Sequence, residues 1–434
     1  MLDRFFKLQE HHTTPRQEVI AGITTFATMA YIIVVNPKVL EAAGMPFGAT
    51  MVATILSAFI GTFLMGVYAN RPFAVAPYMG QNAFIAYTVV EVLGYSWQTA
   101  LGAIFVSGCL FIIITLLKVR SWLARSLPKA LKAGFAAGIG MFLIFIGISN
   151  VGIVEAGAGS APVHVGDLTS LPVILAAISF LFIGYLMIKK VNGAMLIGIL
   201  AITIVGFVTG ATEIPSEWVS TPPSLGPIFM ELDVAGALAW GFFSVILTIF
   251  IIDFVDTMDT LIGVAYDTDM LDEDGNLPEI EKPLLCDAIA TSAGALLGTS
   301  TTGTFIESAA GIKAGGRTGL TAVVTSMLFL IALFLSPFFS IIPAYAYSPV
   351  LIMVGVMMIS PLKDVDYGDM TESIPAILTV TLMSFTYNIG IGLTAGLASY
   401  PILKLITGRS NEVSTGLWVL GVLSLLFYIF YPYA

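Results

Sequence analysis

Charged residues are scarce in this sequence, and their scarcity excludes an ordinary soluble protein. Asp, Glu, Lys and Arg make up 11% of the 434 residues and 57% of the chain is hydrophobic, whereas a soluble domain is roughly 25% charged. Apolar runs of about 18 residues or more, the length that crosses a membrane as a helix, recur along the whole chain. We therefore predict an all-α polytopic membrane protein without a separate soluble domain. The net charge of −10 also excludes a basic surface for nucleic acid.

Histidine and cysteine are also rare, and their positions exclude several kinds of chemistry. His11, His12 and His164 fall in predicted aqueous regions, so no histidine can relay protons inside the membrane. Cys109 and Cys286 fall in or beside apolar runs, where we expect small buried side chains and no disulfide. The sequence has no Walker loop, no heme or metal ligand set and no exposed catalytic triad. We therefore expect no metal, no cofactor and no enzymatic activity.

The basic residues predict the topology. The N-terminal region has no apolar run followed by a small-residue cleavage site, so we expect no cleaved signal peptide. If the N-terminus is cytoplasmic, Lys38 is the only one of the 18 Lys and Arg residues on the far side. The predicted cytoplasmic residues include the cluster Lys118, Arg120, Arg125, Lys129 and Lys132. The loops 154–170 and 212–234 contain neither Lys nor Arg and are predicted to be external. We predict a multi-pass protein of the plasma membrane, which is the inner membrane in a bacterium.

Two of the fifteen predicted apolar segments differ from the rest. The segments lie near 19–37, 47–69, 73–92, 97–117, 130–153, 171–188, 192–211, 235–265, 284–298, 299–315, 318–342, 345–361, 372–387, 390–407 and 413–433. The third and tenth contain "AVAPYMGQNAFIAY" and "GTSTTGTFIESAAG", which are rich in small, hydroxylated or Pro residues, and each holds an amide or a carboxylate. Each is the third segment of a half that contains seven segments. Because seven is odd, the second half is inserted in the membrane with the opposite orientation to the first. Such a pair indicates a transporter site near the midplane. Whether the run 413–433 spans the membrane or lies partway is open.

The eighth segment, "FSVILTIFIIDFVDTMDTLIGVAYDTD", carries unusual acids. Asp253, Asp256 and Asp259 are spaced three apart, so they share one broad face of a helix. Three carboxylates in a membrane helix cost several kcal/mol. The alternative is that acids here are helix caps or lie beyond the membrane, which is our interpretation of Asp267 and Asp269. For the other three, a role in a site and a structural role both stay open.

Glu307 and Asn82 are the polar groups of the two interrupted segments. An acid at the start of a helix that begins near Thr304 is stabilised by free N–H groups, and it can also face a cavity as a ligand. The Asn82 amide can either hydrogen-bond a heterocycle or tie down unwound backbone. Arg71 and Arg317 stand beside Gly or Pro at the predicted cytoplasmic face, where we expect topology and lid residues.

The balance of charge also restricts the substrate. No Lys or Arg falls at the predicted midplane, which weighs against an anion. The substrate is expected to be neutral or cationic, with hydrogen-bond donors for carboxylates. An isolated carboxylate at the midplane is costly to ionise, so it is expected to bind a proton when the site is occluded. Proton symport is therefore favoured over sodium, with Glu307, Asp256 and Asp259 as coupling candidates.

Four strings resemble a known family. "AGITTFATMAYIIVVNP", "APYMGQNAFIAY", "DFVDTMDTLIGVA" and "GTSTTGTFIESAAGIKAGGRTGLTAV" are similar to the hypoxanthine, guanine and adenine permease branch of the nucleobase-ascorbate transporter superfamily. The resemblance covers about 3–410. It implies about 14 segments in a 7+7 inverted repeat, with two broken segments that each form a short strand and a half-helix. It also implies a homodimer in which a core (1–127 and 235–342) moves against a gate (128–234 and 343–434) like an elevator.

The resemblance also implies which residues bind the substrate. Those matching the family's pattern are Asp256 and Asp253 in segment 8, Thr260 nearby, Glu307 in segment 10, the stacking aromatic Phe305, the backbone donor Ile306, and Asn82 with Ala83 in segment 3. Asp259 and Tyr78 stand where the branch usually has Gly. Gln81 replaces an apolar residue, and Phe305 replaces Tyr. These departures bear on the preferred substrate and on the coupling.

The expected function is secondary active import of a purine nucleobase. Glu307 and Asp256 would receive the purine's N–H donors in charge-assisted hydrogen bonds, Phe305 would stack on the ring, and Asn82 would position the opposite edge. One alternative is a facilitator or channel for small neutral solutes, which leaves the acids of segment 8 unexplained. Another is an anion permease on the same architecture, in which those carboxylates would repel the substrate.

Overall fold

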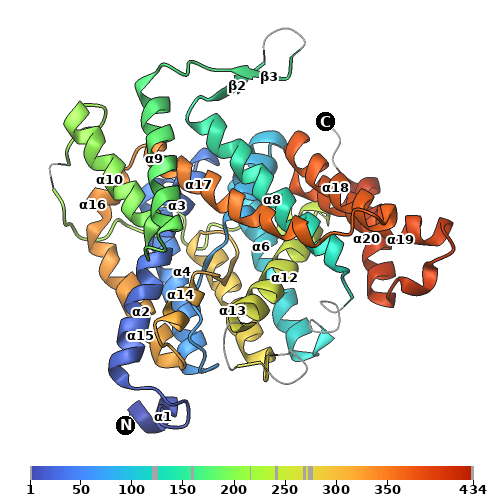
Figure 1. Ribbon diagram of the computed structural model, residues 1–434, viewed down its shortest axis with the longest axis horizontal. Helices are drawn as coiled ribbons and strands as arrows, with labels where there is room; N and C mark the ends of the chain where they lie inside the picture. The colour runs from blue at the N-terminus through green and yellow to red at the C-terminus, as the bar shows by residue number, and fades with distance from the viewer. Residues whose placement is uncertain are drawn as a thin grey trace.

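The computed structural model describes residues 2–119, 126–157, 161–215, 217–239, 243–266, 270–271 and 277–431. Arg120, Arg125, Asp267 and Asp269, assigned above to aqueous regions, lie outside these ranges. Most of the described chain is helical, as the composition predicts (Figure 1). Eight mostly helical stretches of the described chain are long and apolar enough to cross a membrane. They are Pro15–Ala42, Phe47–Val67, Trp97–Leu116, Lys129–Asn150, Leu171–Ile188, Gly319–Ser340, Ala344–Asp364 and Ile389–Ile406.

The helices pack in two groups. The first group contains α2 (Pro15–Met29), α3 (Ile32–Ala42), α4 (Phe47–Val67), α6 (Trp97–Leu116), α12 (Phe243–Tyr266), α13 (Glu281–Leu297) and α15 (Gly319–Ala332). The second contains α8 (Lys129–Asn150), α9 (Leu171–Ile188), α10 (Ala194–Thr209), α17 (Ala344–Ile359), α18 (Met370–Phe385), α19 (Ile389–Ile406) and α20 (Thr415–Phe430). α13 packs on α4 and α6, whereas α8 packs on α17, α18 and α19. The groups meet where α3 contacts α17 and α12 contacts α19 and α20. Figure 1 shows α2 and α15 on one side of the molecule and α18 to α20 on the other.

Two short strands interrupt the first group. β1 (Val75–Pro77) is followed by α5 (Met79–Ala83) and a π-helix (Phe84–Val92), and β4 (Thr302–Thr304) is followed by α14 (Ser308–Lys313). The strands pair antiparallel with Ala76 opposite Gly303. A Cβ on Gly303 would collide with the Tyr78 ring, so only glycine allows this close approach. The two interrupted segments, far apart in sequence, therefore lie side by side.

The first predicted segment, 19–37, is not one continuous helix. α2 ends at Met29 and α3 begins at Ile32, which leaves Ala30 and Tyr31 between them. Neither residue of the break is Gly or Pro, so the sequence carries no local signal for it. The break turns Tyr31 toward the start of α14, and this contact matters for the site.

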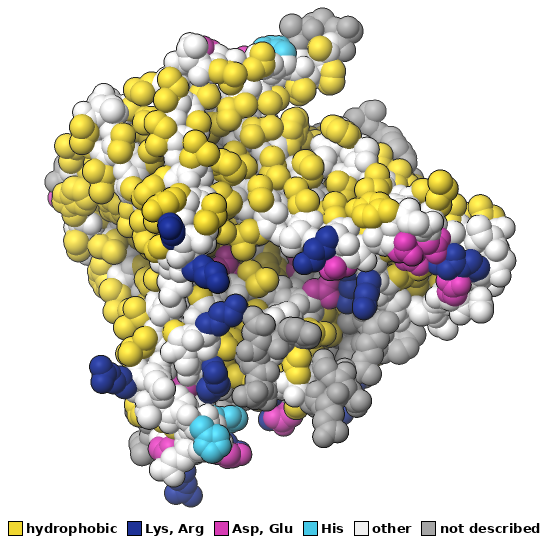
Figure 2. Space-filling view, viewed as in Figure 1, with side chains coloured by type: hydrophobic (Ala, Val, Ile, Leu, Met, Phe, Trp, Pro, Cys, Tyr) yellow, Lys and Arg dark blue, Asp and Glu magenta, His cyan; other side chains and the backbone are white. Residues whose placement is uncertain are grey.

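Basic side chains are unevenly distributed on the face shown in Figure 2. β2 (Val154–Ala156) and β3 (Val163–Val165) form a hairpin at the end opposite to the N-terminus and the short α1 (Leu2–Phe6) (Figure 1). On the face in Figure 2, Lys and Arg lie in the lower and middle parts, on the side of the N-terminus, and the upper part is apolar. The remaining short helices are α11 (Val234–Ala237) and α16 (Ser336–Ser340).

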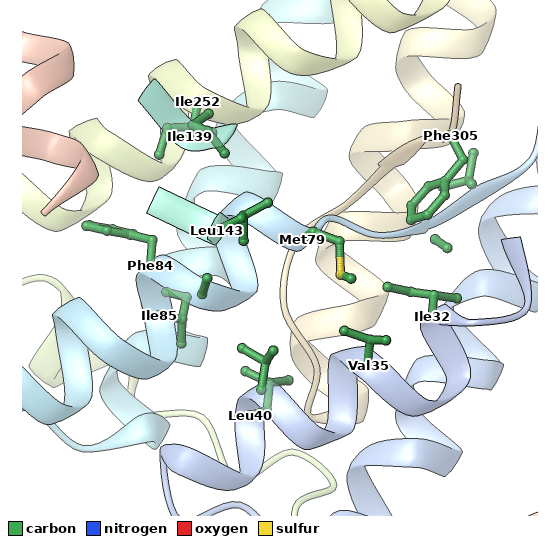
Figure 3. Close-up of a cluster of buried hydrophobic side chains, with 14 of the residues drawn as sticks. Ile32, Val35, Leu40, Met79, Phe84, Ile85, Ile139, Leu143, Ile252 and Phe305 are labelled. Atoms are coloured by element: carbon green, nitrogen blue, oxygen red, sulfur yellow. The ribbon is translucent and has the colours of Figure 1, made fainter. Parts of the chain in front are cut away.

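Buried apolar side chains fill the space between the helix groups. Figure 3 shows Val35 of α3, Met79 of α5, Leu143 of α8 and Ile252 of α12 in one cluster, with Phe305 at its edge. Met79 and Phe305 are 5% exposed and the other three are fully buried. This packing supports the backbone around the two strands.

Candidate functional site

A cavity of about 540 Å³ lies between the two helix groups. The first group contributes α12, the residues after β1 and the connection from β4 to α14, and the second contributes α8 and α17. The predicted substrate-binding residues that line it are Asp256, Thr260, Phe305, Ile306 and Glu307. Asp259, a predicted coupling residue, also lines it. The cavity has the size of a small-molecule site.

Threonine hydroxyls satisfy the outer edges of the strand pair. A two-stranded sheet leaves two edges, and unpaired backbone groups are costly at membrane depth. The Thr62 hydroxyl of α4 donates to Val75 O and accepts from Val75 N, both at 2.9 Å. The Thr291 hydroxyl of α13 does the same for Thr302, at 3.0 and 3.2 Å. Each hydroxyl therefore bonds one N–H and one C=O that a neighbouring strand would otherwise pair.

Glu307 occupies the N-cap position of α14 and lines the cavity. The Tyr31 hydroxyl donates a 2.6 Å hydrogen bond to its Oε1. The Thr28 hydroxyl lies 3.4 Å from the Glu307 carbonyl oxygen. The sequence analysis identified Glu307 but not Tyr31, because no local pattern links residues 276 positions apart.

The three acids of α12 occupy different environments. Asp253 is fully buried and does not line the cavity, whereas Asp256 and Asp259 both line it. Lys132 of α8 also lines the cavity, and its Nζ lies 2.7 Å from Asp259 Oδ1. Lys132 belongs to the cluster predicted to be cytoplasmic, and its contact with the cavity was not predicted. Its position three residues inside α8 is the signal that it could reach inward.

Asn82 belongs to a buried polar cluster outside the cavity lining. Its Nδ2 donates to Asn36 Oδ1 at 2.8 Å, and Asn36 Nδ2 donates to the hydroxyls of Thr54 and Thr299 at 2.7 and 2.9 Å. The Ser300 hydroxyl also donates to Asn36, at 3.3 Å. We call these five residues the Asn36 cluster. It ties both interrupted segments to α3 through side-chain hydrogen bonds. The predicted contact of Asn82 with substrate, and that of the fully buried Ala83, stay predictions.

Two aromatic rings form one wall of the cavity. Tyr78 and Phe305 both line it, with near-parallel rings 9° apart and centroids separated by 6.2 Å. The Tyr78 hydroxyl donates to Thr304 O at 3.2 Å, which fixes the ring against β4. A flat heterocycle can stack on such a wall while its edge meets carboxylates.

Arg317 and Glu18 hold the region of Glu307 in place, although neither lines the cavity. Arg317 Nη1 donates to the Ile312 and Gly316 carbonyl oxygens at 2.7 and 2.8 Å, which caps the end of α14. Glu18 is fully buried and accepts hydrogen bonds from the backbone N–H groups of Arg317, Thr318 and Thr321. It thereby caps the start of α15 from α2.

A second, polar cavity of about 480 Å³ lies toward the other ends of α8 and α17. The Tyr87 hydroxyl there accepts a 3.2 Å hydrogen bond from Asn150, and the Thr88 hydroxyl donates to Tyr387 O at 2.8 Å. These contacts join the π-helix to the second helix group, and Tyr87, Asn150 and Tyr387 line this second cavity. Within the described ranges, no three His, Cys, Asp or Glu residues are arranged to hold a metal ion.

Comparison with known proteins identifies relatives over nearly the whole chain. Residues 16–395 match the family model described as Permease family. The chain is 40% identical over 430 residues to the adenine permease AdeP of Escherichia coli (strain K12), covering 99% of this chain and 96% of that protein. It is 39% identical over 431 residues to the guanine/hypoxanthine permease PbuO of Bacillus subtilis (strain 168), covering 98% and 99%. The transmembrane domain of a cyanobacterium bicarbonate transporter, BicA, has a similar fold, with a TM-score of 0.63 at 17% identity over 88% of this chain and 97% of that chain.

Proposed function

The chain belongs to the Permease family, and on that premise we propose that it is a secondary active transporter that imports purine nucleobases by proton symport. It is a multi-pass membrane permease and not an enzyme. The names of the adenine and guanine/hypoxanthine permeases that it resembles support the substrate class. The observation that carries the proposal is one cavity in which Asp256 and Glu307 face an aromatic wall of Tyr78 and Phe305.

The chemistry of a purine fits this arrangement. Hypoxanthine and guanine carry an N1–H donor, guanine adds a 2-amino group, and adenine has a 6-amino group. A carboxylate that accepts such a donor in a site without bulk water makes a strong hydrogen bond. In our proposal Glu307 and Asp256 accept these donors, Phe305 stacks on the ring, and the Ile306 backbone contributes a donor.

We propose that the two helix groups are a core (1–127 and 235–342) and a gate (128–234 and 343–434), built from 14 segments in a 7+7 inverted repeat. The matched threonines support the repeat, because Thr62 and Thr291 both stand in the helix before a strand. Elevator movement of core against gate would have to break the Lys132–Asp259 ion pair, which joins the groups. A homodimer is proposed from the family resemblance alone.

We propose a plasma-membrane location with a cytoplasmic N-terminus. The main cavity lies near the start of α8 and the end of α17, where Lys132 and Ser360 line it, and the second cavity lies at their opposite ends. If positive residues are cytoplasmic, the main cavity opens toward the cytoplasm. The Tyr87–Asn150 and Thr88–Tyr387 contacts would then close the external side.

Uptake of labelled hypoxanthine into proteoliposomes tests the function. An imposed proton gradient is expected to drive accumulation, a protonophore to abolish it, and adenine and guanine to compete. Glu307→Gln is expected to abolish accumulation, whereas Glu10→Gln, at an exposed glutamate beside Lys7, leaves it unchanged. Unchanged proton-driven uptake in Glu307→Gln would overturn the assignment. Equilibration without accumulation would instead indicate a facilitator, and competition by bicarbonate or sulfate an anion permease.

A further inference from the structure

Tyr31 contacts the carboxylate on which the proposed mechanism depends. Its hydroxyl donates to Glu307 Oε1 at 2.6 Å, and the residue is only 2% exposed. Of the side chains that the structure describes, Tyr31 alone hydrogen-bonds this carboxylate. A hydrogen bond to an ionised group is strong, and exclusion of water strengthens it further.

Close packing fixes the distance between the two residues. α14, which follows Glu307, packs on α2, which precedes Tyr31. A Cβ on Gly311 of α14 would collide with the Thr25 hydroxyl, so the two helices touch backbone to side chain. Glu18 further ties α2 to the start of α15. Tyr31 and Glu307 are therefore held close together by the packing of α14 on α2.

We propose that Tyr31 is a positioning residue that keeps Glu307 Oε1 as a hydrogen-bond acceptor and directs a bound proton to Oε2. This inference rests on the proposed role of Glu307 in substrate and proton binding. The carbonyl oxygen of a carboxylic acid accepts hydrogen bonds better than its hydroxyl oxygen does. Donation from Tyr31 to Oε1 therefore favours the form in which an O–H bond forms on Oε2. The proton arrives from water in the cavity, and the same O–H bond breaks when it leaves.

The consequence concerns substrate recognition. With Glu307 ionised, Oε2 accepts from a purine N–H, and with Glu307 protonated, Oε2 donates to a ring nitrogen or a 6-oxo group. Glu307 Oε2 then both binds the proton and hydrogen-bonds the edge of the base. Without Tyr31 the proton can occupy either oxygen, and the link between protonation and recognition is weakened.

Other charged groups also face the cavity and contribute to any pH dependence. They are Asp256 and Asp259 of α12 and Lys132 of α8, with the Tyr78 phenol beside them. Asp259 is paired with Lys132 at 2.7 Å. A change caused by Tyr31 must therefore appear when only the Tyr31 hydroxyl is removed and all of these groups are kept.

The test uses Tyr31→Phe, which removes the hydroxyl and keeps the ring. Hypoxanthine uptake into proteoliposomes is measured from about pH 5 to about pH 8. Tyr345→Phe is the matched control, because Tyr345 is 5% exposed, its hydroxyl bonds Thr212, and it does not line the cavity. We expect Tyr31→Phe to raise KM roughly tenfold and to change the pH profile of KM, while Tyr345→Phe changes neither.

A Tyr31→Phe profile that coincides with the wild-type profile overturns the inference. If that variant does not fold, infrared difference spectra of the wild-type protein provide a second measurement. Subtraction of the Glu307→Gln spectrum assigns the Glu307 carbonyl band, and incorporation of 3-fluorotyrosine, a stronger donor, must move this band. An unmoved band also overturns the inference. Wild-type uptake by Glu307→Gln would instead refute the proposed function, and the band shift would still report the Tyr31–Glu307 contact.

Discussion

The segment that contains β1 and the segment that contains β4 begin alike and end differently. Each starts with a three-residue strand whose outer edge bonds a threonine of the preceding helix, Thr62 for β1 and Thr291 for β4. A few residues later, Asn82 turns into the buried Asn36 cluster, whereas Glu307 lines the cavity. The comparison shows that equivalent backbones can carry unequal side-chain roles. In our interpretation the first segment stabilises the backbone around the site, and the second supplies the carboxylate that contacts the substrate.

The largest expected effect is a loss of stability when an acid replaces Asn82 in the segment that contains β1. Asn82→Asp removes the donor to Asn36 and puts a carboxylate in a site where Asn82 is fully buried. We expect a loss of about 3–5 kcal/mol in the free energy of unfolding, seen as a large fall in the thermal unfolding temperature of the purified protein. Asn82→Ala serves as the control and is expected to cost about 1–3 kcal/mol. Wild-type stability of Asn82→Asp would mean that the first segment also tolerates a charge.

The next largest effect concerns the segment that contains β4, where substrate binding and stability can be measured separately. Glu307→Gln is expected to weaken hypoxanthine binding by roughly tenfold to a hundredfold, because a charge-assisted hydrogen bond is worth about 1.5–3 kcal/mol. The unfolding temperature is expected to stay close to that of the wild type. Glu18→Gln is the matched comparison, since Glu18 accepts from the backbone of α15 and does not line the cavity. It is expected to lower stability, and an equal fall in Glu307→Gln would show that Glu307 is structural too.

A smaller effect tests the likeness of the two strands. Thr62→Val and Thr291→Val each leave one N–H and one C=O of a strand without a partner. Each is expected to cost about 1–3 kcal/mol, and the two losses are expected to agree within about 1 kcal/mol. Serine at either position keeps the hydroxyl and is expected to restore most of the stability. A large loss at only one position would contradict the structural equivalence of the segments.

The smallest expected effect lies far from both segments. Hydrogen bonds from Arg409 and Lys404 lower the pKa of the Glu412 carboxyl to about 2. A lowered pKa in the folded state contributes stability that is present above the ordinary pKa of about 4.5 and is lost as the pH falls through about 2. This cluster therefore does not titrate between about pH 5 and about pH 8. We expect Glu412→Gln to leave the shape of the pH profile of uptake unchanged, and a shifted profile would place part of the coupling outside the cavity.

The sequence predicted the membrane class and drew attention to the segments where the strands occur, because charge, hydropathy and small residues are local signals. It also identified Asp256, Phe305 and Glu307, which the structure brings to one cavity. Their binding roles stay predictions. The break before Tyr31 was missed because neither Gly nor Pro marks it.

Contacts between distant segments were beyond the reach of the sequence patterns. Tyr31 meets Glu307, and Lys132 meets Asp259, only through the packing of different helices. The positive-inside rule assigns Lys132 to the cytoplasmic side but does not show which cavity or partner its long side chain reaches. The hydrogen bond from Asn82 to Asn36 was not predicted, because the two residues belong to different segments.

The β1–β4 pair has a consequence for amide hydrogen exchange. Beyond the bonds to Thr62 and Thr291, Phe305 N donates to Ala74 O at 2.9 Å, and Tyr78 N donates to Thr301 O at 3.0 Å. Strands as short as these would normally exchange fast, because their ends fray. Here an amide at either outer edge can exchange only after its hydrogen bond to the Thr62 or Thr291 hydroxyl breaks. Exchange therefore depends on the opening of α4 or α13. These few amides are expected to be among the slowest in the protein to take up deuterium.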